Sequence, residues 1–263
     1  MDPTPLKQTI DLSSKAAIVT GGAMGIGFGI AYRLAEAGAS VVVADLQKPA
    51  ADEAVAKLVA KGWKATAVGA DVSSPEQVSH MIDAAVSAYG GVDILVNNAG
   101  IYPTIPVLQM DARDFERILR VNLEGAFLCT KAAAERMIEQ GRGGKIVNVT
   151  SIDALHPSMI GLATYDASKH GLWGFTKNVA LELAPHKIWI NAIAPGAINT
   201  PGTGADSGNK ELQEMLKPFI ARIPMHRMGE PDDIGKVALF LASDLSSYMT
   251  GSQIVVDGGV LLA

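Results

Sequence analysis

Short runs of apolar and β-branched residues alternate with longer stretches of helical periodicity along most of the chain. Several of the short runs are apolar almost without interruption, which is typical of parallel strands covered on both faces. The short runs predict strands at Ala16–Thr20, Ser40–Ala44, Ala65–Gly69, Ile94–Asn97, Lys145–Thr150, Ile188–Ala194 and Gln253–Val256. The periodic stretches predict helices at Ile26–Ala37, Ala50–Lys61, Pro75–Tyr89, Asp111–Glu139, Tyr165–Leu183 and Pro231–Ala242.

The predicted helices carry start and stop signals. Ser74 stands before Pro75, which places a cap residue ahead of a proline in the first turn. Gly38, Gly62 and Gly90 follow the ends of three helices. The alternation predicts one α/β domain over residues 1–263: a Rossmann-type, doubly wound, seven-stranded parallel sheet flanked by helices on both faces.

One segment, Thr200–Met228, interrupts the alternation. It begins Thr-Pro-Gly-Thr-Gly-Ala-Asp-Ser-Gly and then becomes amphipathic. The segment follows the carboxyl end of a predicted strand, where ligands of open α/β sheets bind and where long insertions form lids. We therefore expect a substrate lid at about residues 200–228.

Composition narrows the function classes. The chain is 48% hydrophobic and 19% charged, which indicates a well-filled core. A net charge of −5 without a Lys/Arg run argues against nucleic acid as a partner. Residues 1–14 lack the apolar core of a signal peptide, and no window holds the ~20 apolar residues that span a bilayer. We expect a cytoplasmic protein without a membrane partner, in which the single cysteine, Cys129, is a buried spectator.

Residues just beyond the carboxyl ends of strands are candidates for a site, because ligands of open α/β sheets bind there. The first strand runs into the turn Thr20–Gly27, in which the glycines have the spacing Gly21-x3-Gly25-x-Gly27. Glycines allow a tight turn, and the helix that follows offers free amide groups to a pyrophosphate. The alternative interpretation is a tight turn without a ligand.

The second strand is followed by Asp45, eighteen residues after Gly27. A carboxylate there accepts hydrogen bonds from both hydroxyls of an adenosine ribose and repels a 2′-phosphate. Neither Ala23 nor Met24 supplies a basic side chain for that phosphate, although Lys48 is close in sequence. The turn and the acid together favour NAD over NADP, whereas an Asp that ends a strand is otherwise an ordinary cap.

Three further groups of residues are candidates for the site. The stretch Asn97–Gly100 ends the fourth strand, and Ser151 ends the fifth. Tyr165 precedes Lys169 by four residues, so both lie on one face of a predicted helix. An ammonium near a phenol lowers a pKa that starts at about 10. Each group also has a structural alternative, as a turn, a strand end or a solvated helix face.

Together these motifs resemble those of the compact short-chain dehydrogenase/reductase superfamily, from about residue 12 to residue 260. Their order and spacing carry the resemblance more than any single motif does. The matching elements are Thr20-Gly-x3-Gly-Ile-Gly27, Asp71-Val72, Asn97-Asn-Ala-Gly100, Asn122, Ser151, Tyr165-x3-Lys169, Pro195-Gly196 and Val256-Asp-Gly-Gly259.

The resemblance implies an oxidoreductase that transfers a hydride between nicotinamide and a substrate carbon. Tyr165 would be the general acid/base for the substrate oxygen. Lys169 would lower the pKa of Tyr165 and bind the nicotinamide ribose. Ser151 would hold the substrate oxygen, and Asn122 would position a water that links Lys169 to solvent.

The resemblance also implies the cofactor contacts. Met24 and Ile26 would line the pyrophosphate turn, and the backbone of Ile198 would hold the carboxamide. The implied cofactor-binding residues are Gly21, Met24, Gly25, Ile26, Gly27, Asp45, Asp71, Val72, Asn98, Ala99, Gly100, Tyr165, Lys169, Pro195, Gly196, Ile198 and Thr200. The segment Gln253–Gly259 resembles one that family members use at a two-fold interface, which implies a homotetramer.

One departure from the family pattern concerns the substrate. Tyr165 follows Ser151 by fourteen residues, where the family usually has thirteen. The extra residue falls in the loop that borders the substrate. Asp153 and His156 lie in this loop and could hydrogen-bond substrate hydroxyls, or be solvated loop residues. No second ligand stands at metal-binding spacing from His156, so we expect no metal.

The leading interpretation is an NAD-dependent dehydrogenase of a secondary alcohol, such as a polyol, a sugar or a similar small polar molecule. A 3-oxoacyl thioester (acyl-carrier-protein) reductase is the alternative, although that activity usually draws on NADPH and would favour a basic residue near Met24. A minor alternative is a non-catalytic nucleotide-sensing protein, which should have lost Ser151, Tyr165 or Lys169. A hydrolase is disfavoured, because no Gly-x-Ser-x-Gly elbow precedes a suitable acid and His.

Overall fold

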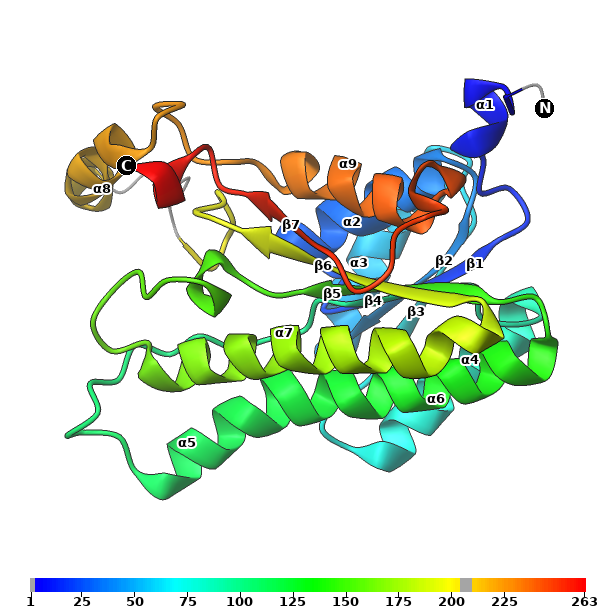
Figure 1. Ribbon diagram of the computed structural model, residues 1–263, viewed down its shortest axis with the longest axis horizontal. Helices are drawn as coiled ribbons and strands as arrows, with labels where there is room; N and C mark the ends of the chain where they lie inside the picture. The colour runs from blue at the N-terminus through cyan, green and yellow to red at the C-terminus, as the bar shows by residue number, and fades with distance from the viewer. Residues whose placement is uncertain (1–2, 204–209) are drawn as a thin grey trace.

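Seven parallel strands form the sheet in the computed structural model, which describes residues 3–203 and 210–263. They lie in the order β3-β2-β1-β4-β5-β6-β7 (Figure 1). Ile18 on β1 pairs with Val42 on one side and with Leu95 on the other, so the chain winds outward in both directions from the centre. The predicted doubly wound sheet is confirmed. The strands are β1 (Ala16–Thr20), β2 (Ser40–Asp45), β3 (Ala65–Gly69), β4 (Ile94–Asn97), β5 (Gly144–Val149), β6 (Ile188–Pro195) and β7 (Gln253–Val256).

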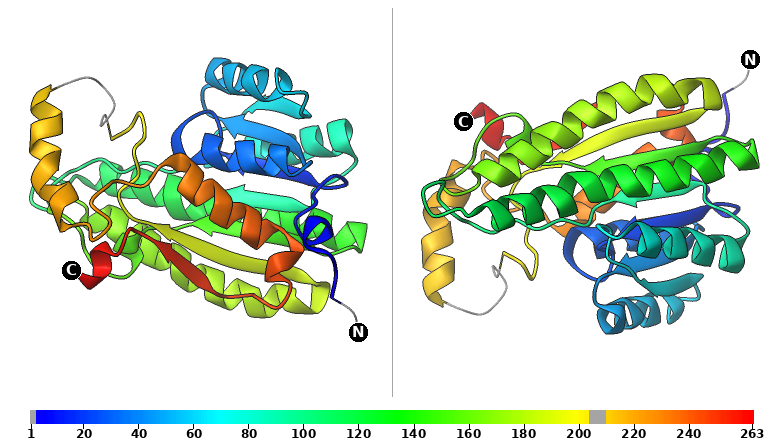
Figure 2. Two further views of the ribbon diagram at one scale, coloured as in Figure 1. Left: turned by 90° about the horizontal axis from the view of Figure 1, so that it is seen from above. Right: turned by 90° about the horizontal axis from the view of Figure 1, so that it is seen from below.

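Helices cover both faces of the sheet, as Figure 2 shows from two sides. One face carries α2 (Gly25–Glu36), α3 (Lys48–Val59) and α9 (Pro231–Ala242), whose apolar side chains form one core cluster with the sheet. A second cluster underlies α4 (Pro75–Tyr89), α6 (Gly125–Gln140) and α7 (Ala163–Leu183) on the other face. Cys129 is fully buried in this second cluster, where burial raises the pKa of its thiol to about 12.

The remaining helical segments lie outside these two helical layers, and all of them except α8 are short. They are α1 (Leu6–Thr9), α5 (Ala112–Leu119), α8 (Lys210–Arg222), the π-helical turn η1 (Arg120–Glu124) and the 3₁₀ turns η2 (Ile152–Ala154), η3 (Ala184–His186), η4 (Asp244–Ser246) and η5 (Val260–Leu262). No helix within residues 3–203 and 210–263 is long and apolar enough to cross a membrane.

The helix predicted at Asp111–Glu139 is present and runs without a gap from Ala112 to Gln140, but it is not α-helical throughout. The chain forms α5 and α6 with the π-helical turn η1 between them. A π-turn inserts one extra residue without ending the helix, so the apolar periodicity on either side continues and the sequence pattern hides it. Gly125, at the start of α6, lies so close to Val72 that an added Cβ would be 2.8 Å from its Cγ2. The π-helical turn carries Asn122.

Capping chemistry sets the ends of the helices that the sequence predicts best. Both α4 and α9 begin and end at the predicted residues. The Ser74 hydroxyl accepts a hydrogen bond from the Gln77 amide (3.4 Å), and α4 stops at Gly90, which has a φ of 81°. A left-handed φ of this kind favours glycine, so the stop signal has a direct conformational cause.

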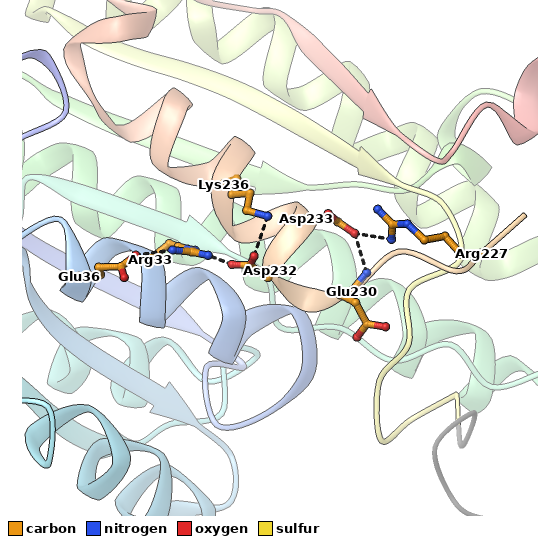
Figure 3. A network of polar contacts seen from close by, with 7 residues as sticks. All are labelled: Arg33, Glu36, Arg227, Glu230, Asp232, Asp233 and Lys236. Carbon is orange, nitrogen blue, oxygen red and sulfur yellow. Dashed lines mark hydrogen bonds and ion pairs between the residues drawn. The ribbon is translucent and has the colours of Figure 1, made fainter. Parts of the chain in front are cut away.

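Ion pairs join α2 to α9 at the surface (Figure 3). The Arg33 guanidinium lies between Glu36 on its own helix and Asp232 at the start of α9. Hydrogen bonding from Arg33 holds the pKa of Asp232 down to about 2, and Lys236 adds a second contact (2.7 Å). Because these groups are partly exposed, the network orients α9 more than it stabilises the fold.

A second set of contacts in Figure 3 fixes the chain just before α9. Asp233 accepts hydrogen bonds from the Glu230 backbone N–H (2.9 Å) and from Arg227 (2.8 Å). Glu230 and Asp233 form a reciprocal capping box at the helix start. The carboxyl-terminal end of the predicted lid segment is therefore anchored to the rigid domain.

Candidate active site

The glycine-rich turn between β1 and α2 has the geometry of an anion cradle. Gly21 and Gly25 adopt φ values of 60° and 54°, which L side chains rarely adopt. A Cβ on Gly27 would lie 2.0 Å from the Gly21 carbonyl oxygen, so only glycine fits at position 27 without a change in the turn. The N-cap of α2 is Met24, and within the described residues no side chain caps its first amides. These amides remain free for a phosphate group.

The end of β4 is tied to the end of β1. The Thr20 hydroxyl accepts the backbone N–H groups of Asn98 (3.0 Å) and Ala99 (3.1 Å). The side-chain amide of Asn98 donates in turn to the backbone carbonyls of Thr20 (2.9 Å) and Gly21 (3.0 Å). These bonds hold the two strand ends together at the switch point of the sheet, where open α/β sheets bind their ligands.

The two acidic residues expected near adenosine both organise backbone. Asp45 accepts hydrogen bonds from the amides of Ala23 (3.2 Å) and Gln47 (3.0 Å), which places its carboxylate against the glycine turn. Asp71 accepts from the backbone N–H (2.9 Å) and the hydroxyl (2.7 Å) of Ser73. Both oxygens of Asp45 keep a lone pair, and Oδ2 of Asp71 is not used by Ser73, so both carboxylates can still accept from a ligand.

Tyr165 and Lys169 lie one turn apart on α7. The Lys169 Nζ donates to the Val149 carbonyl (2.8 Å) and lies 5.6 Å from the centre of the Tyr165 ring. Burial lowers the pKa of Lys169 to about 8, and the nearby Asp153 charge opposes part of that shift. Burial also raises the pKa of Tyr165 above its ordinary value, and a hydrogen bond with Ser151 offsets only part of the increase. The expectation of a lowered Tyr165 pKa is not met here, because desolvation outweighs the hydrogen bond with Ser151 and the charges of Asp153 and Asp166 raise the pKa further.

Ser151 is bound to the loop that follows it. Its hydroxyl donates to Asp153 Oδ2 (2.7 Å) and accepts the Asp153 backbone N–H (3.1 Å). Asp153 Oδ1 accepts the backbone N–H of Ser158 (3.0 Å), and only 6% of Asp153 is exposed. His156 is exposed, with Nδ1 2.9 Å from the carbonyl oxygen of Pro157. The structure therefore brings Asp153, but not His156, to the group around Ser151.

Asn122 fixes the loop after β4 through its side chain. Its amide group accepts the Ile101 N–H (2.8 Å) and donates to the Ile101 carbonyl (2.8 Å) and to Ser168 Oγ (3.1 Å). A Cβ on Gly100 would lie 3.3 Å from Asn122 Oδ1 and 3.7 Å from Lys169 Nζ, so these groups meet around a glycine. Both side-chain N–H donors of Asn122 are used, and Oδ1 keeps one lone pair, so the side chain has a single acceptor position left for the expected water.

A cleft of about 1680 Å³ opens along the carboxyl ends of the strands. All seventeen expected cofactor-binding residues line it, together with Ser151 and Asp153. Among the described residues that line the cleft, Asn122 and His156 do not appear. Within the described part of the chain, no group of three or more His, Cys, Asp or Glu side chains is placed to hold a metal ion.

Tyr102 is a cleft residue that the sequence analysis missed. Its ring meets the Tyr165 ring edge-on, with the ring centres 6.2 Å apart. A Cβ on Gly202 would lie 2.3 Å from the Tyr102 hydroxyl oxygen, so this side chain also reaches the start of the predicted lid. The signal was present, because Tyr102 stands two residues after the Asn-Ala-Gly turn, where residues that follow a strand face the cleft.

The residues present fit a dinucleotide. The uncapped amides of α2 suit a pyrophosphate, and the carboxylate of Asp45 suits ribose hydroxyls. At the other end of the cleft, the buried residues Ser151 and Lys169 and the half-buried Tyr165 form a polar group. A nucleotide cradle that continues into a group able to exchange protons defines a class of protein, the nicotinamide-dependent oxidoreductases.

Comparisons with known proteins identify the family. The model of a family described as Enoyl-(Acyl carrier protein) reductase matches residues 21–261. A 3-oxoacyl-[acyl-carrier-protein] reductase, FabG, of Aquifex aeolicus is 40% identical over 95% of this chain and 99% of its own. An L-rhamnose 1-dehydrogenase (NAD(P)(+)) of Azotobacter vinelandii is 40% identical over 95% of this chain and 98% of its own. A crystal structure of a short-chain type dehydrogenase/reductase from Mycobacterium marinum superposes with a TM-score of 0.91, at 38% identity, over 97% of this chain and 99% of that one.

The chain belongs to the short-chain dehydrogenase/reductase superfamily. It is an oxidoreductase that acts on CH–OH or ketone groups. The non-catalytic alternative is set aside, because Ser151, Tyr165 and Lys169 are all present and meet in one cleft.

Proposed function

We propose that the protein is an NAD-dependent dehydrogenase of a secondary alcohol, with a polyol, a sugar or a similar polar molecule as substrate. The observation that carries the choice of NAD is Asp45, whose carboxylate lines the cleft beside the glycine turn. A carboxylate in this position repels a 2′-phosphate. Lys48, the basic residue nearest in sequence, pairs with Asp52 instead (2.5 Å).

The bound nicotinamide would supply the hydride acceptor, and residues of this chain would handle the proton and the orientation. We assign the proton of the substrate oxygen to the Tyr165 hydroxyl, and the holding of that oxygen to Ser151. Lys169 would bind ribose hydroxyls, since its buried ammonium keeps donor capacity beyond its bond to Val149. Asn122, at the π-turn, would position a water that links Lys169 to solvent.

Two observations support a polar substrate. The buried carboxylate of Asp153 adjoins Ser151 in the substrate loop. A relative with 40% identity is named as a dehydrogenase of the sugar L-rhamnose. We propose that Asp153 faces the substrate. His156 would need a movement of its loop to join the site, because its side chain is exposed.

The second candidate is a 3-oxoacyl thioester reductase. Three relatives, at 38–40% identity, carry this name. The two candidates differ in the direction of the reaction and in the size of the substrate.

A substrate panel separates the candidates. The protein is assayed with polyols, sugars including L-rhamnose, simple secondary alcohols and acetoacetyl thioesters, each with NAD(H) and with NADP(H). The proposal expects the largest kcat/KM for a polar secondary alcohol with NAD. A larger value for a thioester with NADPH would reverse the assignment.

The choice of cofactor has its own variant. Asp45→Ser combined with Met24→Arg should move the preference toward NADP, because one repulsion is removed and one charge–phosphate contact is added. Asp52→Asn is the matched control, since it removes an exposed carboxylate from α3 and should leave the preference unchanged. Equal use of NAD and NADP by the unaltered protein would contradict the role of Asp45.

We further propose that residues 200–228 act as a substrate lid and that the protein works in the cytoplasm. Residues 204–209 of the lid lie outside the described residues. The described parts are the turn at Thr200–Thr203, which lines the cleft, and α8. Hydrogen exchange of α8 should slow when NAD and substrate bind, and unchanged exchange would contradict a lid.

A further inference from the structure

The hydrogen bonds of Ser151 determine what it can offer to a substrate. Its hydroxyl has one proton and two acceptor positions. The proton is donated to Asp153 Oδ2 (2.7 Å), and one acceptor position receives the Asp153 backbone N–H (3.1 Å). One lone pair remains, and because Tyr165 also hydrogen-bonds with Ser151, a substrate oxygen would have to take this position over from the Tyr165 hydroxyl.

The partner of Ser151 is itself held in place. Asp153 lies in the turn η2, is 6% exposed, and uses Oδ1 to accept the Ser158 backbone N–H (3.0 Å). The two carboxylate oxygens thus have separate donors, one a hydroxyl and one a backbone amide. Rotation of the carboxylate would break both bonds in a buried place, which is unfavourable because buried polar groups would lose their partners.

We propose that Asp153 is a positioning residue that makes Ser151 a hydrogen-bond acceptor toward the substrate oxygen, so that the site binds an alcohol more tightly than the corresponding ketone. An alcohol has a proton to donate to the remaining lone pair of Ser151. A ketone oxygen has none, so it faces another acceptor and loses the bond. The effect lies in the binding step, in which no covalent bond changes. The inference rests on the proposed role of Ser151 and deepens it by naming the hydroxyl form as the preferred ligand.

The variant Asp153→Asn reverses this hydrogen bond. The Ser158 N–H still needs an acceptor, so the amide oxygen takes the position of Oδ1. The amide nitrogen then takes the position of Oδ2 and donates to Ser151 Oγ. The Ser151 proton is released and can be donated to a ketone.

The test measures two dissociation constants in complexes that cannot turn over. Cyclohexane-1,4-diol, which has no carbonyl group to reduce, is titrated into the enzyme with NADH, and cyclohexane-1,4-dione, which has no hydroxyl group to oxidise or donate, into the enzyme with NAD. Asp153→Asn should weaken the binding of the diol and tighten the binding of the ketone. Each dissociation constant should change by about 3- to 10-fold, the range for one hydrogen bond. Asp153→Ala should change both dissociation constants in the same directions as Asp153→Asn, but by a smaller factor. This variant replaces Asp153→Asn in the test if the Asn variant does not fold.

Controls separate positioning from a loss of charge or of structure. Asp166→Asn neutralises a carboxylate on α7 that acts on Tyr165 electrostatically, and it should leave the ratio of the two constants unchanged. If Asp153 had only a structural role, its substitution would weaken the binding of the diol and of the ketone alike. Parallel changes, no change, or no preference for the diol in the unaltered protein would overturn the inference. Ser151→Ala tests the proposed function separately: if it leaves turnover intact, the role of Ser151 fails as well.

Discussion

At the scale of single residues, desolvation decides the protonation of the site. Tyr165 is half-buried, and desolvation raises the pKa of its hydroxyl above the ordinary value, while desolvation of the fully enclosed ammonium lowers the pKa of Lys169 to about 8. Near neutral pH the phenol therefore carries its proton and the ammonium its charge. A phenol in this state can donate a hydrogen bond to a substrate oxygen, and it becomes a base only when further positive charge enters the cleft.

Tyr165→Phe tests the assigned proton transfer. The substitution keeps the ring and its packing against Tyr102 but removes the hydroxyl. Turnover should fall by roughly 10²–10⁴, the usual contribution of general acid–base catalysis, while NAD affinity stays within a few-fold. Tyr89→Phe is the matched control, because it removes a hydroxyl that pairs with Thr66 on the edge strand β3. Steady-state kinetics and NAD titration measure both, and normal turnover in Tyr165→Phe would refute the assignment.

The lowered pKa of Lys169 predicts how stability depends on pH. Its folded pKa is about 8, against 10.5 for the unconstrained group. Between these values the amine binds more protons in the unfolded chain than in the native protein, so its contribution to the free energy of unfolding should rise from pH 8 to pH 10. The gain is at most about 3 kcal/mol, and it disappears below pH 8, where both states carry the proton.

Urea denaturation of Lys169→Met at several pH values checks this sign. Most of the rise should disappear in the variant, leaving the smaller part that Lys145 contributes, since burial lowers the pKa of Lys145 also. Above about pH 9 the raised pKa of Cys129 acts in the opposite direction, and above about pH 10 that of Tyr165 does so too, so the informative window is pH 8 to 9. The same slope in both proteins would mean that the buried amine is not the cause.

At the scale of elements, the glycine turn before α2 is the most constrained piece of backbone. In Gly27→Ala the added methyl group would strike the Gly21 carbonyl, so the turn must open. The expected loss is about 1–3 kcal/mol of stability, as for other overpacked sites, together with weaker NAD binding. Urea denaturation and NAD titration measure the two effects.

Gly174→Ala on α7 is the matched control for this substitution. No described atom lies within 4 Å of an added Cβ at Gly174. Alanine should therefore stabilise the helix by about 0.5–1 kcal/mol through its higher helix propensity. If both variants gained stability, the close contact at Gly27 would not limit the turn.

At the scale of the whole molecule, the edge strand β7 bears on assembly. Val255 is 40% exposed on this outer strand, within the segment whose resemblance implies a two-fold interface. We predict a homotetramer, held in part through this strand. Sedimentation should give four copies for the unaltered protein and smaller assemblies for Val255→Arg, because burying an unpaired charge opposes association. Leu6→Arg, at another exposed apolar position, should leave the tetramer intact. A monomeric unaltered protein would contradict the prediction.

The sequence by itself determined the order of the elements and the edge at which the site forms. Apolar runs at β1 and β4 are local signals, because a strand covered on both faces needs side chains that avoid water everywhere along it. Once strands and helices alternate, the handedness of the crossovers brings the carboxyl ends of the strands together. Asp45, Ser151 and Tyr165 then meet in one cleft although they are far apart in the chain.

Only the tertiary structure decided the features that depend on contacts between distant segments. The π-turn at Asn122 leaves the apolar periodicity intact, so its position follows from hydrogen bonds to Ile101 and Ser168 rather than from pattern. The outward placement of His156 and the inward placement of Asp153 depend on how one loop packs. The raised pKa of Tyr165 has the same origin, because the desolvation of a side chain is set by everything that surrounds it and not by its neighbours in sequence.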